Sequence, residues 1–205
     1  MPTAREALLE AAGLALAARP WPTVRMVEVA AAAGVSRQTL YNEFGGKEGL
    51  AHALLRRETD WYLAGVDRLL GGPAGGRERL VAVAEWTVRA ARTHPLLRAL
   101  LTGCWDQRLP APCRTPPRAP SGVPGRWRAG PAVPGPGELA RAVRERATAA
   151  LEPGESTARR CELAVRLALS YVLVPGEEPP EAGLGELLGA AERRLSERNR
   201  RAGGR

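Results

Sequence analysis

Apolar residues recur three and four positions apart along most of the chain, the spacing that gathers side chains on one face of an α-helix. In the segment 4–19, for example, Leu8, Leu9, Ala12 and Leu16 follow this spacing. Sustained alternation of apolar and polar residues, the pattern of a strand, is not found. The pattern predicts an all-α fold. The expected helices cover residues 4–19, 25–33, 37–44, 47–70, 77–93, 96–101, 138–151, 156–174 and 184–198.

Local signals mark the ends of the first three helices. The prolines on both sides of Trp21 end the first helix, because proline lacks an N–H and clashes with a continuing helix. Thr23 suits the N-cap of the second helix and Ser36 that of the third. Gly34 follows the second helix, where a left-handed residue is wanted. We therefore expect a three-helix domain over residues 1–46.

A long segment without hydrophobic periodicity interrupts the remaining helices. Residues 108–137 are rich in proline, glycine and arginine, a composition that cannot build a packed core. So long a segment is unusual inside a compact domain. It is either a flexible loop or a stretch altered by a reading-frame error, and both interpretations stay open. The prediction is a second helical domain over residues 47–205 that contains this flexible segment.

The net charge of +8 is unevenly distributed. In residues 1–50 five basic and five acidic side chains cancel, while the excess lies in residues 108–128 and 193–205. A basic surface often indicates nucleic-acid binding. Here the first domain is neutral, so any argument for DNA binding must come from a motif.

Such a motif lies at residues 29–50, VAAAAGVSRQTLYNEFGGKEGL. Two short predicted helices are joined by a turn at Gly34, the arrangement of a helix-turn-helix. In this motif the second helix enters the major groove. Leu40 and Phe44, four residues apart, would anchor that helix to the core.

The remaining side chains of this helix suit contact with DNA. Arginine pairs with guanine, glutamine and asparagine pair with adenine, and threonine contacts the thymine methyl group. Lys47 begins the next helix, where its charge and the helix N-terminus both attract phosphate. The alternatives, an ordinary solvated helix face and a plain surface lysine, are disfavoured by the turn and its flanks. The predicted DNA-binding residues are Ser36, Arg37, Gln38, Thr39, Tyr41, Asn42 and Lys47.

This region resembles the DNA-binding domain of the TetR/AcrR family of transcriptional regulators, over about the first 65 residues. Glu43 stands where histidine is common in the family, which leaves the base preference open. The resemblance implies a repressor that a small-molecule ligand releases from a palindromic double-stranded DNA operator. The alternative is a constitutive DNA-binding or scaffolding module. The matching residues are Leu8, Leu9, Ala11, Ala12, Ala33, Gly34, Val35, Ser36, Thr39, Leu40, Tyr41, Phe44, Lys47, Glu48, Gly49 and Leu50.

For the second domain the resemblance implies a ligand-binding bundle that forms a homodimer through its last two long helices, here 156–174 and 184–198. Aromatic residues are candidates for the walls of a ligand cavity. An equally weighted alternative makes them core or dimer residues. The candidates are Trp61, Trp86, Trp105 and Tyr171.

Other classes of function are disfavoured. The chain has only two histidines, no Ser/His/Asp set and no glycine-rich phosphate loop, so we expect no enzyme and no cofactor. His94 precedes a proline and is interpreted as a helix cap, and together with the cysteines it lacks zinc spacing, so no metal is expected. There is no secretory leader and no apolar stretch of about eighteen residues, so we expect a cytoplasmic protein that does not bind a membrane.

Overall fold

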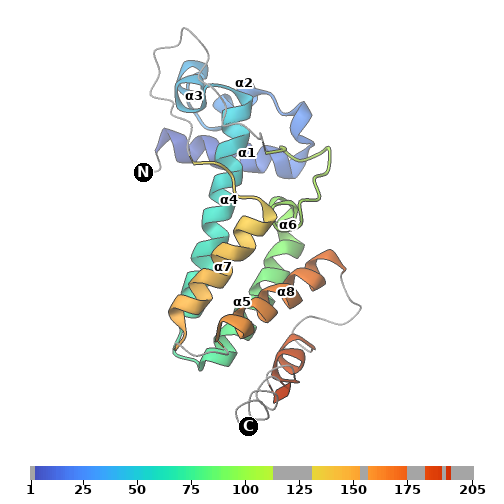
Figure 1. Ribbon diagram of the computed structural model, residues 1–205. Coiled ribbons are helices and arrows are strands. Elements are labelled where there is room, and N and C mark those ends of the chain that lie inside the picture. The colour runs from blue at the N-terminus through green and yellow to red at the C-terminus, as the bar shows by residue number, and fades with distance from the viewer. Residues whose placement is uncertain (1–2, 113–130, 153–156, 175–182, 191–192, 195–205) are drawn as a thin grey trace. The chain divides into compact units, whose positions relative to one another are not determined.

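The computed structural model describes residues 3–112, 131–152, 157–174, 183–190 and 193–194, and in this part of the chain all regular structure is helical (Figure 1). The predicted all-α fold is confirmed there. The elements are α1 (Ala4–Ala18), η1 (Trp21–Thr23), α2 (Met26–Ala32), α3 (Arg37–Phe44), α4 (Lys47–Leu70), α5 (Gly76–Thr93), α6 (Pro95–Thr102), α7 (Pro136–Ala150) and α8 (Thr157–Leu173).

The chain divides into two compact units. The N-terminal unit comprises Met1–Asp60 and Cys104–Pro134, and the C-terminal unit comprises Trp61–Gly103 and Gly135–Arg205. The division falls inside α4, whose first turns belong to the N-terminal unit. The expected domain boundary after residue 46 stays a prediction.

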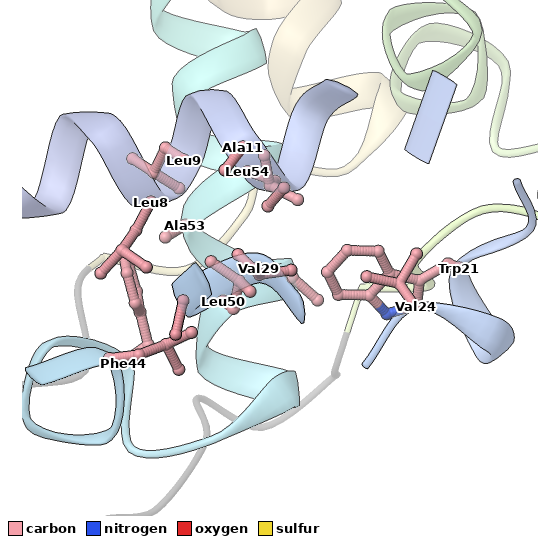
Figure 2. Packing of buried hydrophobic residues seen from close by; sticks show 14 residues of the cluster. Leu8, Leu9, Ala11, Trp21, Val24, Val29, Phe44, Leu50, Ala53 and Leu54 are labelled. Carbon is pink, nitrogen blue, oxygen red and sulfur yellow. The ribbon is translucent and has the colours of Figure 1, made fainter. Parts of the chain in front are cut away.

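The N-terminal unit has a core of leucine, alanine, valine and aromatic side chains, to which α1, α2, α3 and the start of α4 contribute. Leu8, Leu40 and Leu50 are fully buried, and Phe44 is 1% exposed. Figure 2 shows Leu8 of α1 directed toward Phe44 of α3. Burial of each such side chain contributes about 1.5–3 kcal/mol, so this cluster fixes α3 against the rest of the unit.

The start of α1 is fixed by a reciprocal cap that the sequence reading did not identify. The Glu6 N–H donates to Thr3 Oγ1 at 3.2 Å, and the Thr3 N–H donates to Glu6 Oε2 at 2.7 Å. These hydrogen bonds favour the charged carboxylate and lower the pKa of Glu6. These hydrogen bonds satisfy two backbone N–H groups at the start of α1, which fixes the start of the helix at Ala4.

The region between α1 and α2 differs from the prediction. Thr23 is the last residue of the short helix η1, where its hydroxyl donates to the Pro20 carbonyl at 2.8 Å. Arg25 therefore takes the N-cap position of α2, and the predicted role of Thr23 is wrong. Trp21 is 7% exposed, and Figure 2 shows its indole beside Val24 in the core. The Trp21 N–H donates to the Arg108 carbonyl at 2.7 Å, which ties the residues after α6 to this unit.

In the C-terminal unit α5 packs against α6 and α8, and α7 packs against α6 and α8. α7 begins at Pro136, two residues before the predicted start, because proline tolerates the first helical turn and Glu138 Oε2 accepts from the Gly135 N–H at 2.9 Å. Residues 183–190 are helical, so this helix starts one residue before the predicted range 184–198. The expected cap Ser156, the segment 113–130 and the end of the last helix lie outside the described residues.

None of the described helices combines the length and apolarity needed to span a membrane.

Candidate nucleic-acid interface

A tight turn sets the direction of α3 relative to α2. The Gly34 N–H donates to the Ala31 carbonyl at 3.1 Å and the Val35 N–H to the Ala30 carbonyl at 3.0 Å. Gly34 has a φ of 68°, a left-handed conformation that costs other residues about 1–2 kcal/mol. Val35 packs partly buried against the core. The turn thus has the helix-turn-helix geometry that the sequence predicts.

The first turn of α3 is held by its own cap. Ser36 Oγ accepts from the Thr39 N–H at 3.0 Å and lies 2.8 Å from Thr39 Oγ1. Capping of this kind contributes about 1 kcal/mol. Both side chains therefore have a structural partner, and their predicted contacts with DNA stay predictions.

The outward face of α3 carries two ordered pairs of side chains. Gln38 Nε2 donates to Asn42 Oδ1 at 2.9 Å, one turn apart. The Arg37 guanidinium lies 5.3 Å from the centre of the Tyr41 ring. Arg37 and Gln38 are exposed, while Tyr41 and Asn42 are half-buried. The structure thus brings four predicted contact residues to one surface, opposite the buried Leu40 and Phe44.

Lys47 lies at the N-terminus of α4 and contacts η1. Its Nζ donates to the Pro22 carbonyl at 2.9 Å and lies 5.4 Å from the centre of the Trp21 ring. Partial burial lowers the pKa of Lys47. An ammonium group has three N–H donors, so the bond to Pro22 leaves capacity for a phosphate oxygen.

Arg5 is a residue of this region that the sequence reading did not identify. Its Nη1 lies 3.6 Å from the Glu43 carboxylate and donates to the Glu43 carbonyl at 3.2 Å. The guanidinium also lies 4.7 Å from the centre of the Phe44 ring. Thirty-eight positions separate Arg5 from Glu43, so no local pattern could indicate this pair. Arg5 offsets the negative charge that Glu43 places near the predicted DNA surface.

The predicted ligand residues Trp61 and Trp86 belong to an aromatic cluster in the C-terminal unit. Their ring centres are 5.0 Å apart, and the Trp61 ring stacks on His94 at 4.2 Å. His94 occupies the C-cap position of α5 and the N-cap position of α6, as its interpretation as a helix cap predicts, although its side chain makes no capping hydrogen bond. Trp86 packs against Gly65 of α4, where an added Cβ would lie 2.7 Å from the indole.

The other two predicted ligand residues lie elsewhere. Trp105 belongs to the N-terminal unit, and Tyr171 lies half-buried on α8. The four candidates are therefore divided between the two units, and they do not line one cavity within either unit. Their role in ligand binding stays a prediction.

An apolar pocket in the C-terminal unit is lined by other residues instead. Its cavity volume is only about 20 Å³, room for about one water molecule, and α4 to α8 all contribute to its walls. The walls consist of leucine, valine and alanine apart from Tyr62, Thr87 and Cys161. The sequence reading missed Tyr62 because helical spacing shows which positions share a face and not which face encloses a cavity.

No group of three or more metal-ligating side chains occurs in the part of the chain that the structure describes.

Comparisons with known proteins agree with this geometry. Residues 8–54 match the family model described as "Bacterial regulatory proteins, tetR family". The HTH-type transcriptional regulator AlkX of Mycobacterium tuberculosis is 35% identical over 100 residues, which are 48% of this chain and 47% of that protein. A second HTH-type transcriptional regulator of M. tuberculosis is 33% identical over 99 residues, 48% of this chain and 49% of that protein. The chain thus spans about half the length of the curated relatives it matches.

Solved structures share the fold at lower identity. The TetR family repressor AlkX from a Dietzia strain superposes with a TM-score of 0.50 at 20% identity, covering 94% of this chain and 95% of its own. A tetR-family transcriptional regulator from Streptomyces coelicolor gives a TM-score of 0.53 at 21% identity, covering 92% and 79%. At these identities the likeness concerns the fold alone.

The turn, the exposed face of α3 and the matched residues define the N-terminal unit as a helix-turn-helix domain of the TetR type. Residues 8–54 of the chain are thus similar to the DNA-binding region of the tetR family of bacterial regulatory proteins.

Proposed function

We propose that this chain is a DNA-binding transcriptional repressor that acts as a homodimer on a near-palindromic operator and is released by a small molecule. The observation that carries the proposal is the ordered polar face of α3, held outward by the buried Leu40 and Phe44. A surface helix without a binding role would not need a positive-φ turn and a buried core to fix its direction.

Gln38 and Asn42 are the proposed base-reading residues. Their mutual bond uses one amide hydrogen of Gln38 and the amide oxygen of Asn42. The Gln38 oxygen and the Asn42 amide hydrogens retain their capacity for DNA. An acceptor beside a donor matches the N6–H and N7 edge of adenine in the major groove. We therefore expect adenine in each half-site.

The phosphate backbone is the proposed partner of Lys47 and Tyr41. Lys47 adds its charge to the N–H groups in the first turn of α4, and both attract an anion. The bond from Lys47 to Pro22 limits where the ammonium can lie. Contacts of this kind position the protein on DNA without reading sequence.

Dimerisation is proposed through the last two helices. Leu173, Val174 and Leu187 are 53%, 76% and 46% exposed, and all lie on C-terminal elements. Large apolar side chains that gather on a surface commonly mark an interface. A dimer would present two copies of α3 about 34–36 Å apart, one turn of DNA.

Ligand release is proposed to act through α4, a single helix with Tyr62 in the pocket wall and Lys47 beside η1. A ligand that shifts this helix would change the separation of the two α3 helices. The HTH-type transcriptional regulator AlkX of Mycobacterium tuberculosis, 35% identical over 100 residues, supports a regulatory role here. By linkage, DNA must weaken ligand binding by the same factor.

The test is selection of bound duplexes from a random-sequence library at low ionic strength. We expect enrichment of a near-palindrome whose half-sites are about one helical turn apart. The double variant Gln38→Ala/Asn42→Ala should lose this enrichment, and the control Arg98→Ala, at an exposed position of α6, should retain it. Absence of any enriched sequence with the unaltered protein would contradict the proposal.

A further inference from the structure

A segment that follows α6 in the chain holds the short helix η1 of the N-terminal unit. The first N–H groups of a helix have no acceptor within that helix. In η1 this applies to the N–H of Trp21, which donates to the Arg108 carbonyl at 2.7 Å. The Trp21 side chain is 7% exposed. The residue is therefore fixed by the core through its indole and by Arg108 through its backbone.

The Arg108 carbonyl is itself held by a turn that Asp106 builds. Asp106 Oδ1 accepts from the Arg108 N–H at 2.8 Å, the pattern of an Asx-turn. The Asp106 carbonyl accepts from the Leu109 N–H at 3.0 Å. Because the Leu109 N–H and the Arg108 carbonyl belong to one planar peptide group, this second bond sets the direction of the carbonyl. Pro110, the residue after the turn, is buried and anchors it.

η1 in turn provides the partners of Lys47. The Lys47 Nζ donates to the carbonyl of Pro22, the residue after Trp21, at 2.9 Å and lies 5.4 Å from the centre of the Trp21 ring. A free lysine side chain has about 2 kcal/mol of rotamer entropy to lose when it binds. Since η1 already restricts the ammonium group, contact with a phosphate loses less of this entropy.

We propose that Asp106 is a positioning residue for DNA binding: through the Arg108 carbonyl and η1 it places the Lys47 ammonium where a DNA phosphate can accept from it. The inference rests on the proposed function for the role of Lys47. It adds to the DNA-binding machinery a residue that lies outside the matched residues 8–54.

The first test needs no DNA, because Lys47 is the only lysine of the chain. Isotope-labelled lysine therefore gives one side-chain signal in NMR spectra of the full chain. The Trp21 ring should displace this signal from its position in free lysine, and partial burial lowers the pKa of Lys47. Asp106→Ala should move the signal toward the position of free lysine and return the pKa of Lys47 toward 10.5.

Conservative variants separate the hydrogen bond from the charge. Asp106→Asn keeps a side-chain acceptor and loses the charge, so the Lys47 signal should stay where it is. Asp106→Ser forms such a turn more weakly and should give an intermediate displacement, which also keeps the test available if Asp106→Ala fails to fold.

Glu138→Ala is the matched control. Glu138 is another exposed carboxylate that accepts from a backbone N–H, that of Gly135, at 2.9 Å, but it lies in the C-terminal unit. Its substitution should leave the Lys47 signal unchanged. Thermal unfolding of each variant shows that the fold persists.

The second test measures affinity for a mixed-sequence duplex by fluorescence anisotropy at low ionic strength, since phosphate contacts do not depend on sequence. Asp106→Ala should weaken binding about two- to fivefold, no more than Lys47→Ala does, while Asp106→Asn should not weaken it. When Lys47 is already alanine, Asp106→Ala should have no further effect, because its influence passes through Lys47.

An unchanged Lys47 signal in Asp106→Ala, equal effects of Asp106→Asn and Asp106→Ala, an equal effect of Glu138→Ala, or an undiminished loss of affinity in the Lys47→Ala background would overturn the inference. If the unaltered protein does not bind the duplex, the proposed function fails, and the Lys47 signal still shows whether Asp106 positions Lys47. If the duplex is bound and the signal does not move, only the inference about Asp106 fails.

Discussion

Arg5 of α1 neutralises Glu43 of α3 from across the N-terminal unit, with Nη1 3.6 Å from the carboxylate and 3.2 Å from the Glu43 carbonyl. The two side chains are 49% and 36% exposed. An ion pair this exposed contributes only about 0–1 kcal/mol to stability. The pair matters more for DNA binding, because an unpaired carboxylate on α3 would repel the phosphates of DNA.

Removal of the Glu43 charge should strengthen DNA binding. We expect Glu43→Gln to raise operator affinity roughly two- to fivefold at low salt, and less at high salt as the charge is screened. Arg5→Gln should lower the affinity, and the double variant should recover most of the loss. Fluorescence anisotropy against a salt series gives the values. Glu145→Gln, which breaks a pair on α7, is the control; weaker binding by Glu43→Gln would contradict the proposed placement.

Substitution of Lys47 should weaken binding to all DNA sequences alike. Lys47→Ala removes one phosphate contact from each protomer. The slope of log affinity against log salt concentration should therefore fall in magnitude by about one for each contact removed. Lys47→Arg, which keeps the charge, should retain most of the slope. If Lys47→Ala changed sequence preference and left the salt dependence intact, its assignment to phosphate would be wrong.

Trp21 should be among the most costly residues to truncate in the N-terminal unit. Its indole is 7% exposed in the core, and Trp→Ala in such a site costs about 3–5 kcal/mol. Trp61, 37% exposed, is the matched control and should cost less than half as much. Urea unfolding followed by circular dichroism measures both, and equal losses would contradict the role of Trp21.

Alkaline pH should destabilise the C-terminal unit through Tyr62. Burial raises the pKa of Tyr62 from 10.0 in model compounds to about 12. Between these values the unfolded chain loses the proton while the folded chain keeps it, so stability is full below pH 10 and is lost as pH rises through 12. The loss should be on the order of 2–3 kcal/mol.

Thermal unfolding across this pH range tests the Tyr62 prediction. Tyr62→Phe should show a flatter decline than the unaltered protein, since phenylalanine has no proton to lose. Identical pH profiles for the two proteins would show that another group controls alkaline unfolding.

The sequence predicted the helices and the exposed face of α3 well because both depend on local rules. The spacing of Leu40 and Phe44 determines which side of α3 is buried, and Gly34 and Ser36 mark its start. The exposed residues Arg37 and Gln38 follow from these positions. Each of these signals lies within a few residues of the feature it predicts.

Features that depend on distant contacts escaped prediction. The two prolines beside Trp21 indicate only the end of a helix, whereas its burial comes from a core cluster that residues of α1, α2, α3 and α4 build together. The pocket is formed by five helices, so no short window shows that Tyr62 and Thr87 meet. The large aromatic residues were predicted to line a cavity, but two of them, Trp61 and Trp86, pack against each other.

The most direct test of the central claim, that α3 reads DNA bases, is a quantitative comparison of base preferences at every position of the selected operator. Gln38→Ala and Asn42→Ala should each relax the preference at one or two positions of each half-site, by about 1–3 kcal/mol per lost contact. Preference elsewhere should stay as in the unaltered protein. An unchanged preference at all positions in both variants would contradict the claim that this face of α3 contacts the bases.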